Sequence, residues 1–228
     1  MLARRRQRHP ARRASAVFLS RGRPALRLPE RLTHDTLTPS LPPQVDTEDQ
    51  TVIDYYAAWI KQLVADYSID GLRIDTVKHV RKDFWPQFAE AAGVYAVGEV
   101  LDGSVDYLTP YTEVMDGILS YAVYYQNLYA FQNTGGSMAT LANTYLDMAS
   151  KSKDNTLLGT FTEVHDLPRA ASLIKDQMLL ANHAAWPFVV DGIPIAYYGQ
   201  EQGFSGGDDP VRFPLARPDL PRCVAILR

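Results

Sequence analysis

Three carboxylates, Asp75, Glu99 and Asp166, each stand at or just after the end of a short apolar run of the β type. A pair of carboxyl groups can cleave a glycosidic bond, because a protonated one donates to the leaving oxygen while an ionised one attacks or stabilises the charged sugar. The sequence shows no Ser-His-Asp arrangement and no CxxC motif, and it has one cysteine. These residue types therefore indicate carboxylate-based hydrolysis, as in glycoside hydrolases.

The neighbours of two of these carboxylates suggest how the roles divide. Arg73 lies two residues before Asp75, so in a strand the two side chains point to the same side. A guanidinium beside Asp75 lowers the pKa of that carboxyl and keeps it ionised, as a nucleophile requires. Glu99 is flanked by apolar residues, which favour the protonated form that a general acid needs.

From residue 46 onward the chain alternates between helical and strand patterns. Thr47, followed three residues later by Gln50, fits a capping box at the start of the first helix. Apolar periodicity predicts helices near residues 48–67, 82–92, 138–148 and 173–190. Runs of β-type residues predict strands near 72–77, 94–100, 117–119, 157–162 and 193–199.

Repeated strand-helix units predict an α/β fold with a parallel sheet, either doubly wound or closed as a barrel. The polar residues gather at the C-terminal ends of successive strands, as they do at the mouth of a (β/α) barrel. No glycine-rich phosphate loop follows a strand. The sequence therefore favours a (β/α) barrel over a doubly wound sheet.

Three motifs resemble the signatures of the α-amylase family of glycoside hydrolases, and of fungal-type members in particular. Residues 70–80 (DGLRIDTVKHV) resemble the second signature, 98–103 (GEVLDG) the third and 161–166 (FTEVHD) the fourth. The likeness continues through residues 82–86, 114–117, 157–161 and 191–195. It covers about residues 46–210, between an unmatched segment, 1–45, and an unmatched tail, 211–228. Because barrels of this family have eight strands, the resemblance implies that this part is an incomplete (β/α)8 TIM barrel, a partial catalytic barrel of about the last five βα units.

The resemblance implies a role for each matched residue. Asp75 would be the nucleophile, Glu99 the general acid and base, and Asp166 the stabiliser of the transition state. The reaction would retain the α configuration, because a covalent intermediate implies two inversions. The substrate would be an α-1,4-linked glucan such as starch or glycogen. Four further residues would contact the sugar: Arg73 and His165 at the cleavage subsite, and Lys78 and His79 on the leaving-group side.

The same resemblance implies a structural calcium ion, for which the backbone carbonyl of His79 would be one ligand. The first signature, which holds an asparagine ligand, does not occur in this sequence, and the other ligands lie in a lobe that nothing here matches. The calcium site would therefore be incomplete. Val164 also stands where the fourth signature has asparagine, and valine makes no side-chain hydrogen bonds.

These departures leave two functions in competition. The first is a retaining α-glucan hydrolase. The second is a catalytically inactive, truncated remnant that lacks the first strands and the calcium-binding lobe. The cyclodextrin-forming transglycosylases share the Lys78-His79 pair, but the fungal-like stretches favour hydrolysis. Tyrosines at 121, 124, 125 and 129 are most simply core packing, although an exposed tyrosine can stack on a glucose ring.

Composition limits the partners of the chain. Its 228 residues are 46% hydrophobic and 21% charged, which is typical of a globular protein. Residues 1–31 hold ten arginines and one acidic residue, which gives this segment a charge of +9. Because the net charge of the chain is −3, the remaining residues carry a charge of −12. An acidic globular part argues against nucleic acid, and the lack of 18 consecutive apolar residues argues against a membrane span.

The basic, proline-rich segment 1–45 is expected to be disordered. Its apolar stretch, residues 16–19, is too short for a secretory signal, so no signal peptide is recognisable. The family resemblance nevertheless implies a secreted protein. The lone Cys223 leaves no intrachain disulfide possible.

Overall fold

The computed structural model describes residues 33–34 and 44–206. Within the segment expected to be disordered, strands β1 (Thr33–His34) and β2 (Gln44–Val45) form an antiparallel pair, so the prediction is wrong at these four residues. The rest of that segment and the tail 211–228 lie outside the described residues. No helix in the described part of the chain is long and apolar enough to cross a membrane.

Five parallel strands follow one another in chain order and carry the site. They are β3 (Gly71–Ile74), β4 (Tyr95–Gly98), β5 (Gly117–Ile118), β6 (Gly159–Phe161) and β7 (Ile193–Ile195). β3 pairs with β4, β4 with β5 and β6 with β7, and a parallel bridge from Leu119 to Gly159 joins the two sheets. The predicted parallel α/β arrangement is confirmed.

The strands are shorter than the sequence predicts, and at β3 the reason is that the chain turns early at the polar end of the strand. Thr76 has φ +52°, in the left-handed region, and directs the chain from β3 into the 3-10 helix η2 (Val77–His79). A β-branched residue is strained in this conformation. The turn ends β3 before Asp75 and brings the following backbone toward Glu99.

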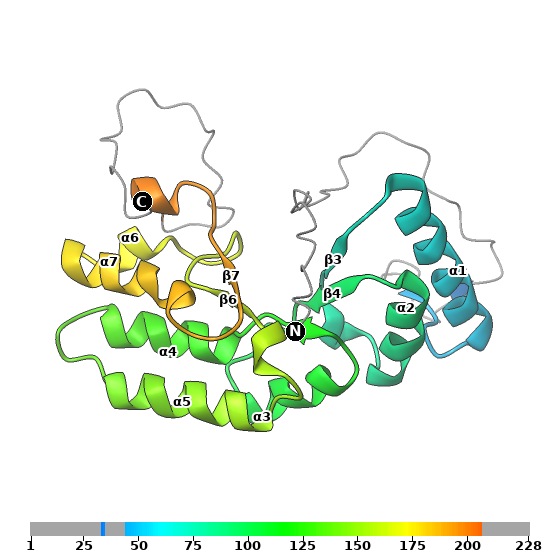
Figure 1. Ribbon diagram of the computed structural model, residues 1–228, viewed down its shortest axis with the longest axis horizontal. Helices are drawn as coiled ribbons and strands as arrows, with labels where there is room; N and C mark the ends of the chain where they lie inside the picture. The colour runs from blue at the N-terminus through cyan, green and yellow to red at the C-terminus, as the bar shows by residue number, and fades with distance from the viewer. Residues whose placement is uncertain (1–32, 35–43, 207–228) are drawn as a thin grey trace, which may run out of the picture.

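Helices α1 (Gln50–Tyr67) and α2 (Trp85–Ala92) pack together beside β3 and β4, and the 3-10 helix η3 (Lys82–Phe84) leads into α2 (Figure 1). Aromatic rings fill their contact, with Tyr56 and Phe84 centroids 6.0 Å apart. Asp49 caps α1 by accepting a hydrogen bond of 2.7 Å from the Thr51 N–H, so the predicted cap at Thr47 is wrong.

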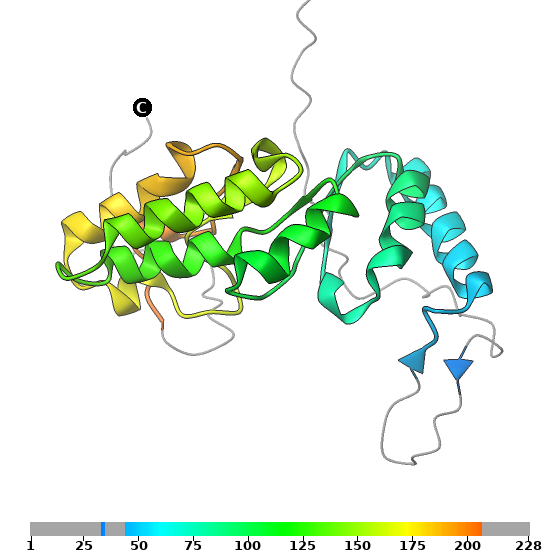
Figure 2. The same cartoon turned by 90° about the horizontal axis from the view of Figure 1, so that it is seen from below.

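Between β5 and β6 the chain forms two long helices that run side by side, α4 (Tyr121–Phe131) and α5 (Met138–Lys151) (Figure 2). The short helix α3 (Val105–Leu108) and the 3-10 helix η4 (Thr109–Glu113) come earlier in the chain, between β4 and β5. Helix α4 has no counterpart among the predicted helices. Its buried residues occupy every side of the helix, so the sequence shows no amphipathic period there.

The helix predicted over residues 173–190 is three separate elements. They are α6 (Ala170–Leu173), α7 (Gln177–Ala185) and the 3-10 helix η6 (Trp186–Phe188). Ile174 is extended and ends α6, and the Asp176 carboxylate caps α7 by accepting from two backbone N–H groups. Shorter 3-10 helices, η5 (Asn155–Leu157) and η7 (Gln200–Gln202), precede β6 and follow β7.

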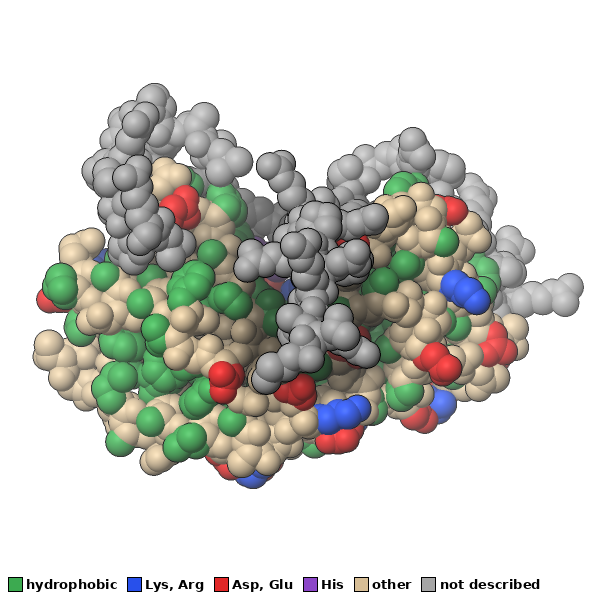
Figure 3. Space-filling view, in the orientation of Figure 1, with side chains coloured by type: hydrophobic (Ala, Val, Ile, Leu, Met, Phe, Trp, Pro, Cys, Tyr) green, Lys and Arg blue, Asp and Glu red, His purple; other side chains and the backbone are tan. Residues whose placement is uncertain are grey.

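The molecule has two halves, one with α1, α2, β3 and β4 and the other with α4, α5, α7, β6 and β7 (Figure 1). One continuous hydrophobic cluster joins them. Its buried side chains come from α1 and α2, from β4 and β5, and from α4 and α5. Hydrophobic side chains also lie on the surface of the half that α4, α5 and α7 form, whereas charged side chains are more frequent toward the other half (Figure 3). The shared core therefore packs against the strands that carry the site.

Candidate active site

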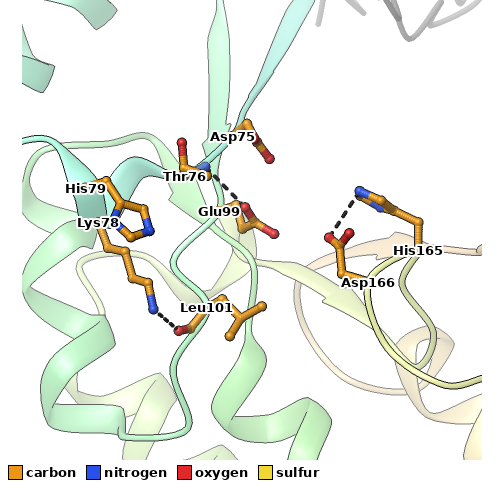
Figure 4. A pocket seen from close by; sticks show the side chains of 8 residues that line it. All are labelled: Asp75, Thr76, Lys78, His79, Glu99, Leu101, His165 and Asp166. Atoms are coloured by element: carbon orange, nitrogen blue, oxygen red, sulfur yellow. Dashed lines mark hydrogen bonds and ion pairs between the residues drawn. The ribbon is translucent and has the colours of Figure 1, made fainter. Parts of the chain in front are cut away.

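The loops after β3, β4 and β6 enclose a cavity of about 390 Å³ (Figure 4). Six of the seven sequence-predicted site residues line it: Asp75, Lys78, His79, Glu99, His165 and Asp166. Thr76 and Leu101 complete the lining. The seventh residue, Arg73, reaches the cavity through the two carboxylates that it contacts. The parallel strands thus bring together residues from three loops, although Asp75 and Asp166 are 91 positions apart in sequence.

Arg73 connects the two principal carboxylates. One guanidinium nitrogen bonds to Asp75 Oδ1, and the other lies 3.1 Å from Glu99 Oε1. The hydrogen bond from Arg73 lowers the pKa of Asp75 below its usual value, while partial burial acts in the opposite direction. The Asp75 side chain is 66% exposed and open to a ligand in the cavity. Asp75 is therefore an ionised, accessible carboxylate.

Glu99 is buried, with 6% of its surface exposed, and its oxygens face hydrogen-bond donors. The Tyr121 hydroxyl donates to Oε1 at 3.2 Å, and the Thr76 N–H donates to Oε2 at 3.1 Å. The sequence predicts apolar surroundings, but neighbouring Val100 points into the core and leaves the carboxylate facing the polar mouth. Donors from three segments therefore fix the orientation of Glu99.

Lys78 ties the loop after β3 to the loop after β4. Its ammonium donates to the Leu101 carbonyl at 2.7 Å, on the opposite side of the cavity lining from Asp75 (Figure 4). His79 is exposed beside it. Lys78 and His79 therefore border the same space, with one side chain anchored and the other free to contact a ligand.

His165 and Asp166 face Asp75 and Glu99 from across the cavity (Figure 4). His165 Nε2 lies 3.1 Å from Asp166 Oδ2, and both side chains are partly exposed. They belong to the loop after β6. The cavity therefore has carboxylates on both sides, as a site that surrounds a positively charged sugar requires.

Sequence reasoning did not identify the partners that position these side chains. Tyr121 carries the hydroxyl that holds Glu99, and Thr76 supplies a backbone donor. Glu163 and Arg169 form a fully buried ion pair next to His165 and Asp166. Tyr121 could have been found from its place just after the end of β5, the position at which the other site residues stand on their own strands.

The side chains of the described residues do not by themselves provide a calcium site. Among residues 33–34 and 44–206, no three His, Cys, Asp or Glu side chains come together in a way that could hold a metal ion. The side chains around His79 do not fit calcium on their own, and no step of the chemistry below depends on a metal. The calcium ligand role of the His79 carbonyl stays a prediction.

The sequence matches a family model for the α-amylase catalytic domain over residues 37–213. The chain belongs to the α-amylase family. It is 54% identical to α-amylase 1 of Lipomyces kononenkoae over 166 residues, which are 73% of this chain and 27% of that protein. It is 48% identical to α-amylase 2 of Schwanniomyces occidentalis over 168 residues, 74% of this chain and 33% of that one.

Solved structures give the same result. An α-amylase from Malbranchea cinnamomea matches with a TM-score of 0.72 and 47% identity over 74% of this chain and 36% of that one. An α-amylase from Geobacillus thermoleovorans, solved with acarbose, matches with a TM-score of 0.73 and 28% identity over 79% and 43%. The resemblance drawn from the three motifs is confirmed, and the chain is a glycoside hydrolase by family. It spans about a third of the length of its curated relatives.

Proposed function

We propose that this member of the α-amylase family hydrolyses α-1,4-glucosidic bonds in starch-like or glycogen-like glucans with retention of configuration. The observation that carries the proposal is the single cavity lined by Asp75, Glu99 and Asp166 together with the sugar-binding candidates His165 and His79. The acarbose complex of the Geobacillus relative supports a glucan-like ligand for this site. The Lipomyces and Schwanniomyces relatives of the chain are α-amylases as well.

The geometry supports a two-step reaction. Glu99, when protonated, gives its proton to the glycosidic oxygen as an oxygen of Asp75 bonds to the anomeric carbon and the leaving chain departs. In the second step, Glu99 takes a proton from water, the water oxygen bonds to the same carbon and Asp75 is released. Asp166, on the opposite side of the cavity, stabilises the positive charge that develops on the sugar in both steps.

The remaining family-based inferences are part of the same proposal. The five described βα units are part of a (β/α)8 barrel, which the likeness to whole α-amylase structures supports. Residues 46–210 form the catalytic part, with segments 1–45 and 211–228 outside it. The protein is secreted, which rests on its membership of the α-amylase family.

The test is product analysis with the full 228-residue chain. The chain is incubated with a maltoheptaose substrate, and the anomeric protons of the first products are followed by NMR before mutarotation. Release of shorter glucans in the α configuration is expected. Products in the β configuration would contradict the retaining mechanism, and no release of products at any pH would contradict the hydrolase proposal itself.

A further inference from the structure

Two charged side chains are enclosed in the loop that follows β6. Glu163 is 4% exposed and Arg169 is 0% exposed. Arg169 Nη1 lies 2.7 Å from Glu163 Oε2, and the Ala170 N–H donates to Glu163 Oε1 at 2.9 Å. Glu163 thus holds both the guanidinium and the backbone at the start of α6. The two contacts close residues 163–170 into a loop.

Arg169 also attaches this loop to the chain that follows β7. Its guanidinium carbon lies 3.9 Å from the ring centroid of Tyr197, 4.9 Å from that of Tyr198 and 5.9 Å from that of Phe204. Its backbone N–H donates to the Gly206 carbonyl at 3.0 Å. A guanidinium over aromatic faces gains cation–π attraction, which is stronger away from water. Arg169 is therefore held from two sides.

The enclosed loop carries the chemistry of the β6 strand end. His165 and Asp166 lie between the two buried charges in sequence and face the cavity. Burial raises the pKa of Glu163, and the Arg169 charge opposes that rise. A buried ion pair is weak evidence for stability, because well-packed apolar residues in its place are often equally stable or more so. Stability alone therefore does not account for these two charges.

We propose that Glu163 and Arg169 are positioning residues that hold His165 and Asp166 in place across the cavity from Asp75 and Glu99. This inference rests on the proposed function. The ion pair sets the length of the loop, and the aromatic contacts of Arg169 anchor that loop to the segment after β7. Misplacement of a catalytic group by about 1 Å can cost about 10²-fold in rate, so a loop of this kind needs a rigid anchor.

The experiment uses the full chain with the double variant Glu163→Gln/Arg169→Met. This variant leaves no unpaired buried charge, and the glutamine oxygen still accepts from the Ala170 N–H. A matched control is Leu141→Ala, which opens the core at α5, far from the loop in sequence and outside the cavity lining. Both variants are compared with the wild type by thermal melting, by kcat and KM on maltoheptaose, and by hydrogen exchange of peptides covering 162–170.

If the proposal is right, the double variant melts as a folded protein, loses at least about tenfold in kcat with a smaller change in KM, and exchanges faster than the wild type at 162–170. Leu141→Ala should lower the melting temperature and keep its kcat within about twofold. A double variant with wild-type kcat, or with unchanged exchange at 162–170, would overturn the positioning role. Should the wild type itself be inactive, the proposed function fails, and the exchange result alone decides between an anchored and an unanchored loop.

Discussion

At the scale of single residues, one guanidinium serves both principal carboxylates. Arg73 bonds to Asp75 and lies 3.1 Å from Glu99, although the sequence suggested only the first contact. The pairing with Asp75 was predictable because two residues separated by one position share a side of a strand. The surroundings of Glu99 were not, because its donors come from positions 22 and 23 residues away on other segments.

Replacement of either principal carboxylate should abolish most of the activity. Loss of acid and base assistance in Glu99→Gln should lower kcat by about 10²–10⁴-fold. Asp75→Asn should lower it further, because an amide cannot form the covalent intermediate. Initial rates on soluble starch provide the measurement, and Asp83→Asn, which alters an exposed ion pair with Arg81, is the control. Activity within tenfold of the wild type for either site variant would refute the assignment.

Arg73 should control the acid limit of activity. Its hydrogen bond lowers the pKa of Asp75, so the ionised form persists to lower pH than that of an ordinary aspartate. Arg73→Met should raise this pKa, and activity should then be lost at a higher pH as the solution is acidified. Arg73→Lys keeps the charge and should shift the acid limb less. The kcat/KM profile between about pH 3 and 7 tests this, and an acid limb that does not move in Arg73→Met would contradict it.

At the scale of elements, the sequence identifies those with a clear period and misses those without one. The parallel strands follow from short β-type runs in regular alternation with helices. Helix α4 was missed because it is apolar on nearly all sides, as a helix inside the core must be. The break between α6 and α7 was missed because the extended residue, Ile174, is as apolar as its helical neighbours.

The start of α1 offers a direct comparison between a predicted cap and the observed one. Asp49→Ala removes the acceptor for the Thr51 N–H and should lower the free energy of unfolding by about 0.5–2 kcal/mol. Thr47→Ala removes the cap that the sequence suggested and should change it by much less. Urea unfolding of the two variants decides between them. A larger loss in Thr47→Ala than in Asp49→Ala would mean that the helix begins earlier than the structure shows.

At the scale of the whole molecule, the site depends on two halves that share one core. Asp75 and Glu99 come from the half that holds β3 and β4, whereas His165 and Asp166 follow β6 in the other half (Figure 1). The hydrophobic cluster runs through both halves without a break. The site is therefore assembled from strand ends of both halves, which this shared cluster joins.

One buried imidazole should make the stability of the whole chain depend on pH. His183 in α7 is 0% exposed, and burial lowers its pKa from 6.5 to about 4. The unfolded chain therefore binds a proton near pH 6.5, while the folded chain resists it down to about pH 4. The contribution of His183 to stability is complete above pH 6.5 and is lost as the pH falls toward 4, by up to about 3 kcal/mol.

The variant His183→Leu isolates this effect, because leucine fills a similar space and does not titrate. Glu163 and Asp75 also make stability depend on pH, with raised and lowered pKa values respectively, but they are common to both proteins and cancel in the comparison. Urea unfolding at about pH 7 and about pH 4.5 should show a loss of stability that is about 2–3 kcal/mol larger in the wild type than in His183→Leu. Equal losses in the two proteins would mean that the imidazole is paired or hydrated in the folded state, so that burial does not disfavour its charge.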